Sequence, residues 1–198
     1  KKIFDAYLNK GIALKNIHKY DDALKYYNFC IKVNPENPKI YSNLGNLFLK
    51  QKKFKEALKV VDKAISLNSK FAEAYAIQGE VNQLLGNYKQ AIVDYERALK
   101  IDGNFNYIQG NILHSKMHIN EWDNFDLQIS KLRKEINNKK KVITPFSLLS
   151  LIDDPKMHKD VAERHSKDNF PFSLNKGNIR SKLKDKINIG YFSSDFIN

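Results

Sequence analysis

Several residue types that mark particular kinds of protein are scarce in this chain of 198 residues. There is one cysteine, Cys30, so no disulfide can form within the chain, which favours a reducing compartment. No apolar run approaches the roughly 18 residues that a membrane-spanning helix needs, and no segment resembles a signal peptide. We therefore expect a cytoplasmic protein without a membrane partner.

Histidine is also scarce, with five in the chain. His114 and His118 are four residues apart, a spacing that can turn two imidazoles toward a metal on one helical face. His158 and His165 also share a face, but neither pair has a third ligand at suitable spacing. No glycine-rich phosphate loop followed by a helix is visible either. We expect neither a metal nor a bound cofactor in this part of the protein.

Negative charge is in deficit, and the resulting net charge of +12 is unevenly placed. A net +8 of it falls in residues 131–186, where Lys139, Lys140 and Lys141 form the densest run. Proteins that bind single-stranded nucleic acid combine such lysines with aromatic side chains that stack on bases. No aromatic residue is interleaved here, so we interpret the run as solvated surface and expect no nucleic-acid partner.

What the chain does contain is a repeat with a period of 34 residues, most visible in Gly11, Gly45 and Gly79. Aromatic and small residues recur at the same interval, in the columns Tyr7, Tyr41, Tyr75; Tyr20, Phe54, Tyr88; Ala23, Ala57, Ala91; and Cys30, Ala64, Ala98. The apolar positions follow helical spacing, and small residues at fixed places suit the crossing of antiparallel helices. The pattern predicts three helical hairpins, in residues 4–37, 38–71 and 72–105.

Each hairpin consists of a first and a second predicted helix joined by a short turn. The first helices are predicted over Phe4–Asn16, Ile40–Gln51 and Ala72–Leu85, and the second over Asp21–Val33, Lys55–Leu67 and Lys89–Ile101. The repeat closely resembles the tetratricopeptide family, which implies a right-handed superhelical solenoid. After Phe105 the period fades. We expect residues 106–140 to form a degenerate capping hairpin and residues 141–186 a mostly helical linker.

The last residues have a different character. Ile187 to Phe192 are rich in β-branched and aromatic side chains, and Ser193, Ser194 and Asp195 then favour a turn. We therefore predict a β-strand and loop over residues 187–198. A single strand cannot satisfy its own backbone groups, so we expect it to be the first strand of a truncated α/β lobe. The predicted fold class is an all-α solenoid with a helical connector and this one C-terminal strand.

Three groups of residues carry a second resemblance. They are Trp122-Asp123, then Pro145-Phe146 with Asp153-Asp154-Pro155, and then Ile189-Gly190-Tyr191-Phe192-Ser193-Ser194-Asp195-Phe196. In this order they resemble bacterial and plant relatives of O-linked N-acetylglucosamine transferase, the SPINDLY-type group included. The resemblance implies that the strand opens a GT-B-type lobe, that UDP-GlcNAc is the donor of the parent enzyme, and that Ser/Thr hydroxyls of proteins are acceptors.

The resemblance also bears on catalysis. The catalytic-region histidine of that family lies beyond the last motif and is not in this chain, so we predict that the 198-residue chain alone shows no transferase activity. Ser194 and Asp195 would lie at the edge of the acceptor cleft, because ligands of open α/β sheets bind beyond the strand ends. The alternative is that they shape the turn or cap the next helix.

A peptide groove is the other site that the resemblance implies, on the concave face lined by the first helices. In the transferase family an asparagine two residues before the glycine column holds the backbone of an extended peptide, since its amide can both donate and accept. Ile77 interrupts this column in the third unit. The candidate groove residues are Asn9, Asn43, Asn46, Glu73, Glu80 and Asn111. Polar surface residues in an asparagine-rich chain are the alternative interpretation.

We therefore predict peptide recognition in the service of protein O-glycosylation, with a non-catalytic scaffold for protein assembly as the alternative. A carboxylate clamp, in which Lys, Asn and Arg of successive first helices hold a peptide C-terminus, is a third binding mode. It needs cations from the first helix of the third unit. Residues 72–85 contain neither Lys nor Arg, which argues against it. The sequence does not predict an oligomeric state.

Overall fold

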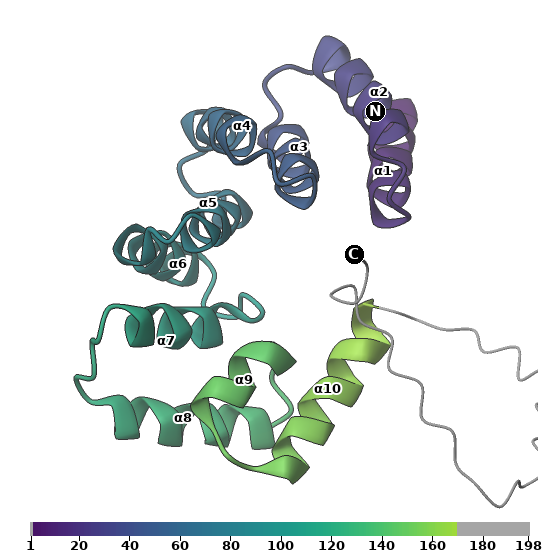
Figure 1. Ribbon diagram of the computed structural model, residues 1–198. Helices are drawn as coiled ribbons and strands as arrows, with labels where there is room; N and C mark the ends of the chain where they lie inside the picture. The colour runs from purple at the N-terminus through teal and green to yellow at the C-terminus, as the bar shows by residue number, and fades with distance from the viewer. Residues whose placement is uncertain (1, 170–198) are drawn as a thin grey trace, which may run out of the picture.

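The computed structural model describes residues 2–169, which form ten α-helices in a curved stack (Figure 1). The first six are α1 (Lys2–Asn16), α2 (Tyr20–Val33), α3 (Pro38–Lys50), α4 (Phe54–Leu67), α5 (Ala72–Leu84) and α6 (Tyr88–Ile101). They pair as three antiparallel hairpins, α1 with α2, α3 with α4 and α5 with α6. The stack bends so that α1, α3 and α5 lie on its inner, concave side and α2, α4 and α6 on its outer side (Figure 1).

The glycine column lies where the two helices of each hairpin cross. A Cβ added at Gly11 would lie 2.6 Å from Cε1 of Tyr27, and one at Gly79 would lie 2.7 Å from Cδ1 of Tyr95. At Gly45 the corresponding neighbour is Cγ2 of Val61, at 2.5 Å. Each contact is closer than a side chain tolerates, so the absent Cβ is what allows the two backbones of a hairpin to approach.

The apolar core is divided into clusters that join one hairpin to the next. The first cluster combines α1 and α2 residues such as Tyr27 and Cys30 with Ile40 and Leu47 of α3. The second joins α3 and α4 to α5, and the third joins α5 and α6 to the following helix. Cys30 is fully buried in the first cluster, and burial raises the pKa of its thiol. We therefore interpret this cysteine as a packing residue rather than a reactive one.

The helices after residue 105 close the stack with a separate core, which we call the C-terminal cap. They are α7 (Ile108–His118), α8 (Phe125–Asn137), α9 (Pro145–Leu151) and α10 (Pro155–Asn169). Helix α7 packs on α6 and α9 and touches α8 only slightly, so α7 and α8 do not form a regular hairpin. The shared core consists of Leu113, Leu132, Ile136, Val142, Ile143, Leu148, Ile152, Met157 and Val161.

A non-helical strap over residues 141–143 takes the place that a second helix would occupy beside α7. Ile143 packs against Gly110, where an added Cβ would lie 2.4 Å from its Cγ1. The Val142 carbonyl accepts a hydrogen bond from the Gly110 N–H at 2.8 Å, and the Lys141 carbonyl accepts one from the Tyr107 N–H. These contacts satisfy amide groups that a helix N-terminus leaves without a partner inside the helix.

The lysine run of the cap is engaged in ion pairs within the chain. Lys139 contacts Asp160 at 3.2 Å, Lys140 contacts Glu135 at 2.6 Å, and Lys141 contacts Asp168 at 2.9 Å. The pairs with Asp160 and Asp168 tie the segment after α8 to α10, whereas the pair with Glu135 returns to α8 itself. The local excess of positive charge is thus partly compensated by neighbouring carboxylates.

The predicted fold class needs one correction. Residues 2–169 contain helices and no strand, so the architecture that the structure describes is an all-helical solenoid. The strand predicted over residues 187–198, like the end of the predicted linker, lies outside the described residues. The prediction inferred a strand from β-branched and aromatic composition alone, and such composition does not fix secondary structure without a paired strand.

Candidate functional site

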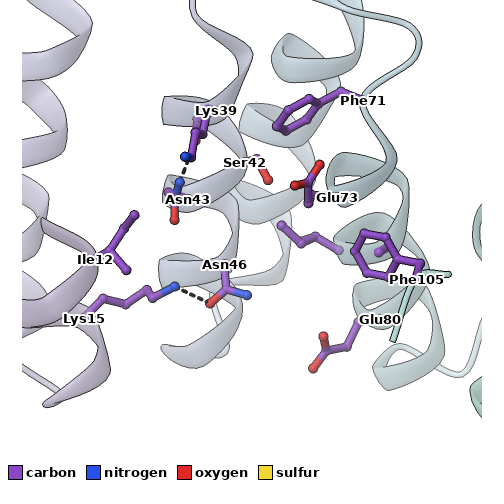
Figure 2. Close-up of a pocket in the computed structure, with 12 residues that line it drawn as sticks. Ile12, Lys15, Lys39, Ser42, Asn43, Asn46, Phe71, Glu73, Glu80 and Phe105 are labelled. Carbon is purple, nitrogen blue, oxygen red and sulfur yellow. Dashed lines mark hydrogen bonds between the residues drawn. The ribbon is translucent and has the colours of Figure 1, made fainter. Parts of the chain in front are cut away.

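A pocket opens on the concave side between α1, α3 and α5 (Figure 2). Its volume is about 300 Å³. Three of its lining residues, Ala76, Glu80 and Phe105, also line a second pocket of about 690 Å³ that extends to α7, α9 and α10. The two pockets therefore form one continuous depression along the inner helices, which we call the concave groove.

One side of the concave groove is formed by α1 and α3 and carries positive charge. Lys15 donates a hydrogen bond from Nζ to Oδ1 of Asn46 at 3.1 Å, across the gap between the two helices (Figure 2). Burial lowers the pKa of Lys15, and the positive charge of Lys50 lowers it further. Lys39 of α3 lines the same side and is exposed. We call this the lysine wall.

The opposite side is formed by α5 and by Phe105, which precedes α7. Glu73 is exposed, whereas Glu80 lies about two helical turns further along α5 and is partly buried. Burial raises the pKa of the Glu80 carboxyl group, although the charge of Lys50 acts in the other direction. In Figure 2 the Phe105 ring lies on the same side as the two carboxylates. We call this the glutamate wall.

The predicted groove asparagines have different environments. Asn43 and Asn46 both line the first pocket, together with the predicted Glu80. Asn43 donates from Nδ2 to the Lys39 carbonyl one turn earlier, at 2.8 Å, so its Oδ1 stays available as an acceptor at the pocket. Asn9 is exposed on α1 and does not line either pocket of the groove. The predicted Glu73 lines this pocket too, so the structure brings four of the six predicted residues together in one pocket.

Asn111 lines the second pocket and belongs to a polar network whose other members line the same pocket. It donates to the Tyr95 hydroxyl at 3.4 Å, and that hydroxyl donates to Oε1 of Gln83 at 2.7 Å. Gln83 in turn contacts Nδ1 of His114 at 3.0 Å. Burial raises the pKa of Tyr95 well above its usual range, so the hydroxyl stays protonated. The network fixes the junction of α5, α6 and α7.

The two histidines predicted to share a face do so. The His114 and His118 ring centroids are 4.7 Å apart, and His118 stacks on Tyr88 at 4.3 Å. Burial and the neighbouring His118 lower the pKa of His114, which favours its neutral form. Within the described part of the chain, no group of three or more His, Cys, Asp and Glu side chains is arranged to hold a metal ion. The pair packs against aromatic and amide groups of adjacent helices.

The residues that suggested a transferase are spread over the cap. Trp122 is half exposed in the turn before α8, where its ring meets that of Phe125 edge-on at 5.1 Å. Phe146 is exposed on α9, and Asp154 caps α10 by accepting from the Lys156 and Met157 N–H groups, both at 3.1 Å. Ser194 and Asp195, the predicted edge of an acceptor cleft, lie outside the described residues.

Sequence reasoning missed several residues that line the groove. Phe71 and Phe105 are the last residues of the second and third units, so the 34-residue period could have identified them as one column. Lys39 occupies the second position of the second unit, equivalent to the predicted Glu73 of the third unit, and carries the opposite charge. Lys15 gave no such signal, because its role depends on a contact with a residue 31 positions later.

Comparison with known proteins was consistent with this geometry. The Tetratricopeptide repeat family matches residues 4–37, 38–71 and 72–105, which is more than half of the chain. A comparison with curated protein sequences gave no match. None of the helices within residues 2–169 has both the length and the apolar character needed to cross a membrane.

Two solved structures show the same fold. The Arabidopsis OM64 TPR domain is 25% identical, with a TM-score of 0.55, and the alignment covers 58% of this chain and 95% of that one. The first TPR of Spaghetti (RPAP3), bound to the HSP90 peptide SRMEEVD, is 25% identical, also with a TM-score of 0.55, and the alignment covers 59% of this chain and 92% of that one. Three matched repeats that fold into three stacked hairpins place this chain in the tetratricopeptide repeat family.

Proposed function

We propose that this chain is a protein-interaction scaffold whose concave groove binds an extended peptide segment of a partner. The continuous depression along α1, α3, α5 and α7 is the observation that carries this proposal. It combines an apolar floor, which includes Ile12, Ala76 and Ile77, with polar side chains along both walls. Such a mixture suits a peptide, which presents backbone amides at every residue and apolar or charged side chains between them.

Hydrogen bonding to the peptide backbone is the expected role of the central asparagine. Asn43 donates its Nδ2 hydrogen to the Lys39 carbonyl, and this bond leaves the Oδ1 atom of Asn43 available as an acceptor. An acceptor at this place can receive a peptide N–H whatever side chain the peptide carries. A groove built in this way tolerates many sequences, as expected of a scaffold.

The solved structure of the first TPR of Spaghetti (RPAP3) supports a peptide as the class of ligand, because that protein is bound to an HSP90 peptide. The charges of the present groove differ from what an acidic peptide needs. Helix α5 contributes Glu73 and Glu80 and contains no Lys or Arg. We therefore do not extend the acidic SRMEEVD ligand to this chain.

Transfer of a sugar from UDP-GlcNAc to Ser/Thr hydroxyls is a second, finer proposal. It depends on the resemblance of Trp122-Asp123, Asp153-Asp154-Pro155 and the motif at residues 189–196 to the transferase family. In that case the groove would present acceptor proteins to a catalytic region of a longer polypeptide. Donor hydrolysis or transfer measured with UDP-GlcNAc and the 198-residue chain is expected to be undetectable, and turnover would contradict the assignment of chemistry to a further region.

The scaffold proposal is tested by replacing Asn43 with alanine. We expect Asn43→Ala to weaken binding of an unstructured peptide, selected on the wild-type chain from a random library, by roughly three- to tenfold, the cost of about one hydrogen bond. Fluorescence anisotropy with the labelled peptide measures the change. Asn28→Ala, on the exposed surface of α2 and outside the groove, is the matched control and should bind as the wild type does. Equal affinities for all three proteins would contradict the proposal.

A further inference from the structure

The two walls of the concave groove differ in how their charges are satisfied. On the lysine wall, the Lys15 ammonium group already has a partner in Asn46, at 3.1 Å. On the glutamate wall, the Glu80 carboxylate has no hydrogen-bond or ion-pair partner among residues 2–169. It borders both pockets of the groove, so a ligand in either pocket can reach it. A positively charged group of a ligand can therefore pair with the glutamate wall, where the Glu80 carboxylate lacks a partner among those residues.

The partly buried environment of Glu80 favours the binding of a cation at its carboxylate. Burial of the carboxylate removes part of its hydration, and Lys50, the positive charge that acts on it, forms no ion pair with it. A carboxylate in this state gains more from a paired cation than a fully hydrated one does, because water competes less. Glu73 lies on the same wall and adds a second negative charge to the field in the pocket.

Phe105 indicates which cation fits best. Its ring is partly buried and lies between the two carboxylates in the view of Figure 2. A guanidinium group can stack on an aromatic face and pair with a carboxylate at the same time, because it is planar and weakly hydrated. A lysine ammonium is compact and strongly hydrated, and it gains less from such a site.

We propose that the concave groove selects peptides that carry an arginine, whose guanidinium pairs with Glu80 and packs on the Phe105 ring. The inference rests on the proposed peptide-binding function and adds the chemistry of the ligand. Peptide carboxylates are directed to the other side of the groove, where Lys39 is exposed and has no ion pair within the described residues. The groove therefore orients a peptide of mixed charge and disfavours one that is acidic throughout.

Selection from a random dodecapeptide display library, with the full 198-residue chain as the target, is the first part of the test. We expect arginine to be enriched among the selected peptides. The same selection on Glu80→Gln should lose that enrichment. Glu56→Gln is the matched control, because Glu56 lies exposed on α4 and outside both pockets, and it should keep the enrichment.

The second part is a double-mutant cycle with one selected peptide, measured by fluorescence anisotropy. On the wild-type chain, replacing the peptide's arginine by methionine should weaken binding about tenfold, and replacing it by lysine should have an intermediate effect. On Glu80→Gln the arginine and methionine peptides should bind with equal affinity. Phe105→Leu keeps the carboxylate and should reduce the preference for arginine over lysine. Thermal unfolding of each variant verifies that the stack is intact.

The outcomes separate this inference from the function on which it rests. Two results would overturn the arginine preference alone, provided that the selected peptides bind the groove and respond to Asn43→Ala. One is the absence of arginine enrichment. The other is that replacing the peptide's arginine by methionine weakens binding to Glu80→Gln as much as it weakens binding to the wild type. A wild-type chain that selects no peptide would overturn the peptide-binding function and this inference with it.

Discussion

At the scale of the residue, two buried tyrosines in the same column of the repeat have different hydrogen bonding. Tyr95 donates to Gln83 at 2.7 Å and accepts from Asn111 at 3.4 Å. Tyr27 is equally buried, but its hydroxyl has no partner among the described residues. The position equivalent to Gln83 in the first unit is Lys15, which contacts Asn46 instead. A repeated sequence position thus does not guarantee a repeated interaction.

This difference predicts opposite responses to the same substitution. Tyr95→Phe removes a hydroxyl that makes hydrogen bonds and leaves Gln83 without its partner, so we expect the free energy of unfolding to fall by about 1–2 kcal/mol. Tyr27→Phe removes a hydroxyl that is buried without a hydrogen bond, so we expect a change between zero and a gain of about 1 kcal/mol. Urea unfolding followed by circular dichroism measures both. Equal losses in the two variants would argue against the assigned networks.

The groove shows what can be predicted about single residues from sequence. Asn43, Asn46 and Glu80 were predicted as groove residues and lie in one pocket, because they occupy the inner face of a helix whose phase the repeat determines. Lys15 and the unpaired state of Glu80 could not be predicted. They depend on distances between different helices, which are set by the packing of the stack.

At the scale of the element, the sequence predicted helices in the repeats and in the cap, but it did not predict how the helices of the cap pack. The period of 34 residues places the ends of α1 to α6 within two residues of those observed, because each turn and each small residue recurs. The cap has no such period. Its contact between Gly110 and Ile143 joins a helix to a non-helical strap, and no local pattern relates these two residues. Tertiary contacts therefore determine how α7 to α10 pack.

The start of α10 offers a test of the cap at this scale. Asp154 accepts hydrogen bonds from the Lys156 and Met157 N–H groups at 3.1 Å, and its other carboxylate oxygen lies 3.6 Å from Nη1 of Arg133. We expect Asp154→Ala to lower the free energy of unfolding by about 0.5–2 kcal/mol, the usual effect of losing an N-cap. Asp153→Ala, at the exposed neighbouring position, should be close to neutral.

Denaturant unfolding of the two aspartate variants provides the measurement. A loss for Asp153→Ala as large as that for Asp154→Ala would show that negative charge before α10, rather than the capping geometry, stabilises the helix. That result would be consistent with an interaction between a carboxylate and the helix dipole.

At the scale of the whole molecule, stability is distributed over clusters that each connect neighbouring units. In such a stack a unit contacts only the units before and after it, so damage at one end should remain local. Leu148 is fully buried in the core of the cap. Leu148→Ala is expected to destabilise the cap by about 2–5 kcal/mol through lost contacts and a residual cavity.

Hydrogen exchange followed by mass spectrometry reveals which helices lose stability in Leu148→Ala. We expect faster exchange in α8, α9 and α10 of Leu148→Ala and unchanged exchange in α1 to α4. Leu149→Ala is the control, because its side chain is exposed on the same helix. A uniform increase in exchange across all helices would show that the solenoid and the cap unfold as one cooperative unit.

The division of the core has a mechanical consequence. Each cluster fastens one hairpin to the first helix of the next, so tension between the ends of the stack passes through every junction in turn. When junctions bear the same force in series, the junction with the lowest mechanical stability separates first. We expect the molecule under tension to lengthen in discrete steps as the hairpins unfold one at a time. The hairpins that remain folded should keep their curved arrangement.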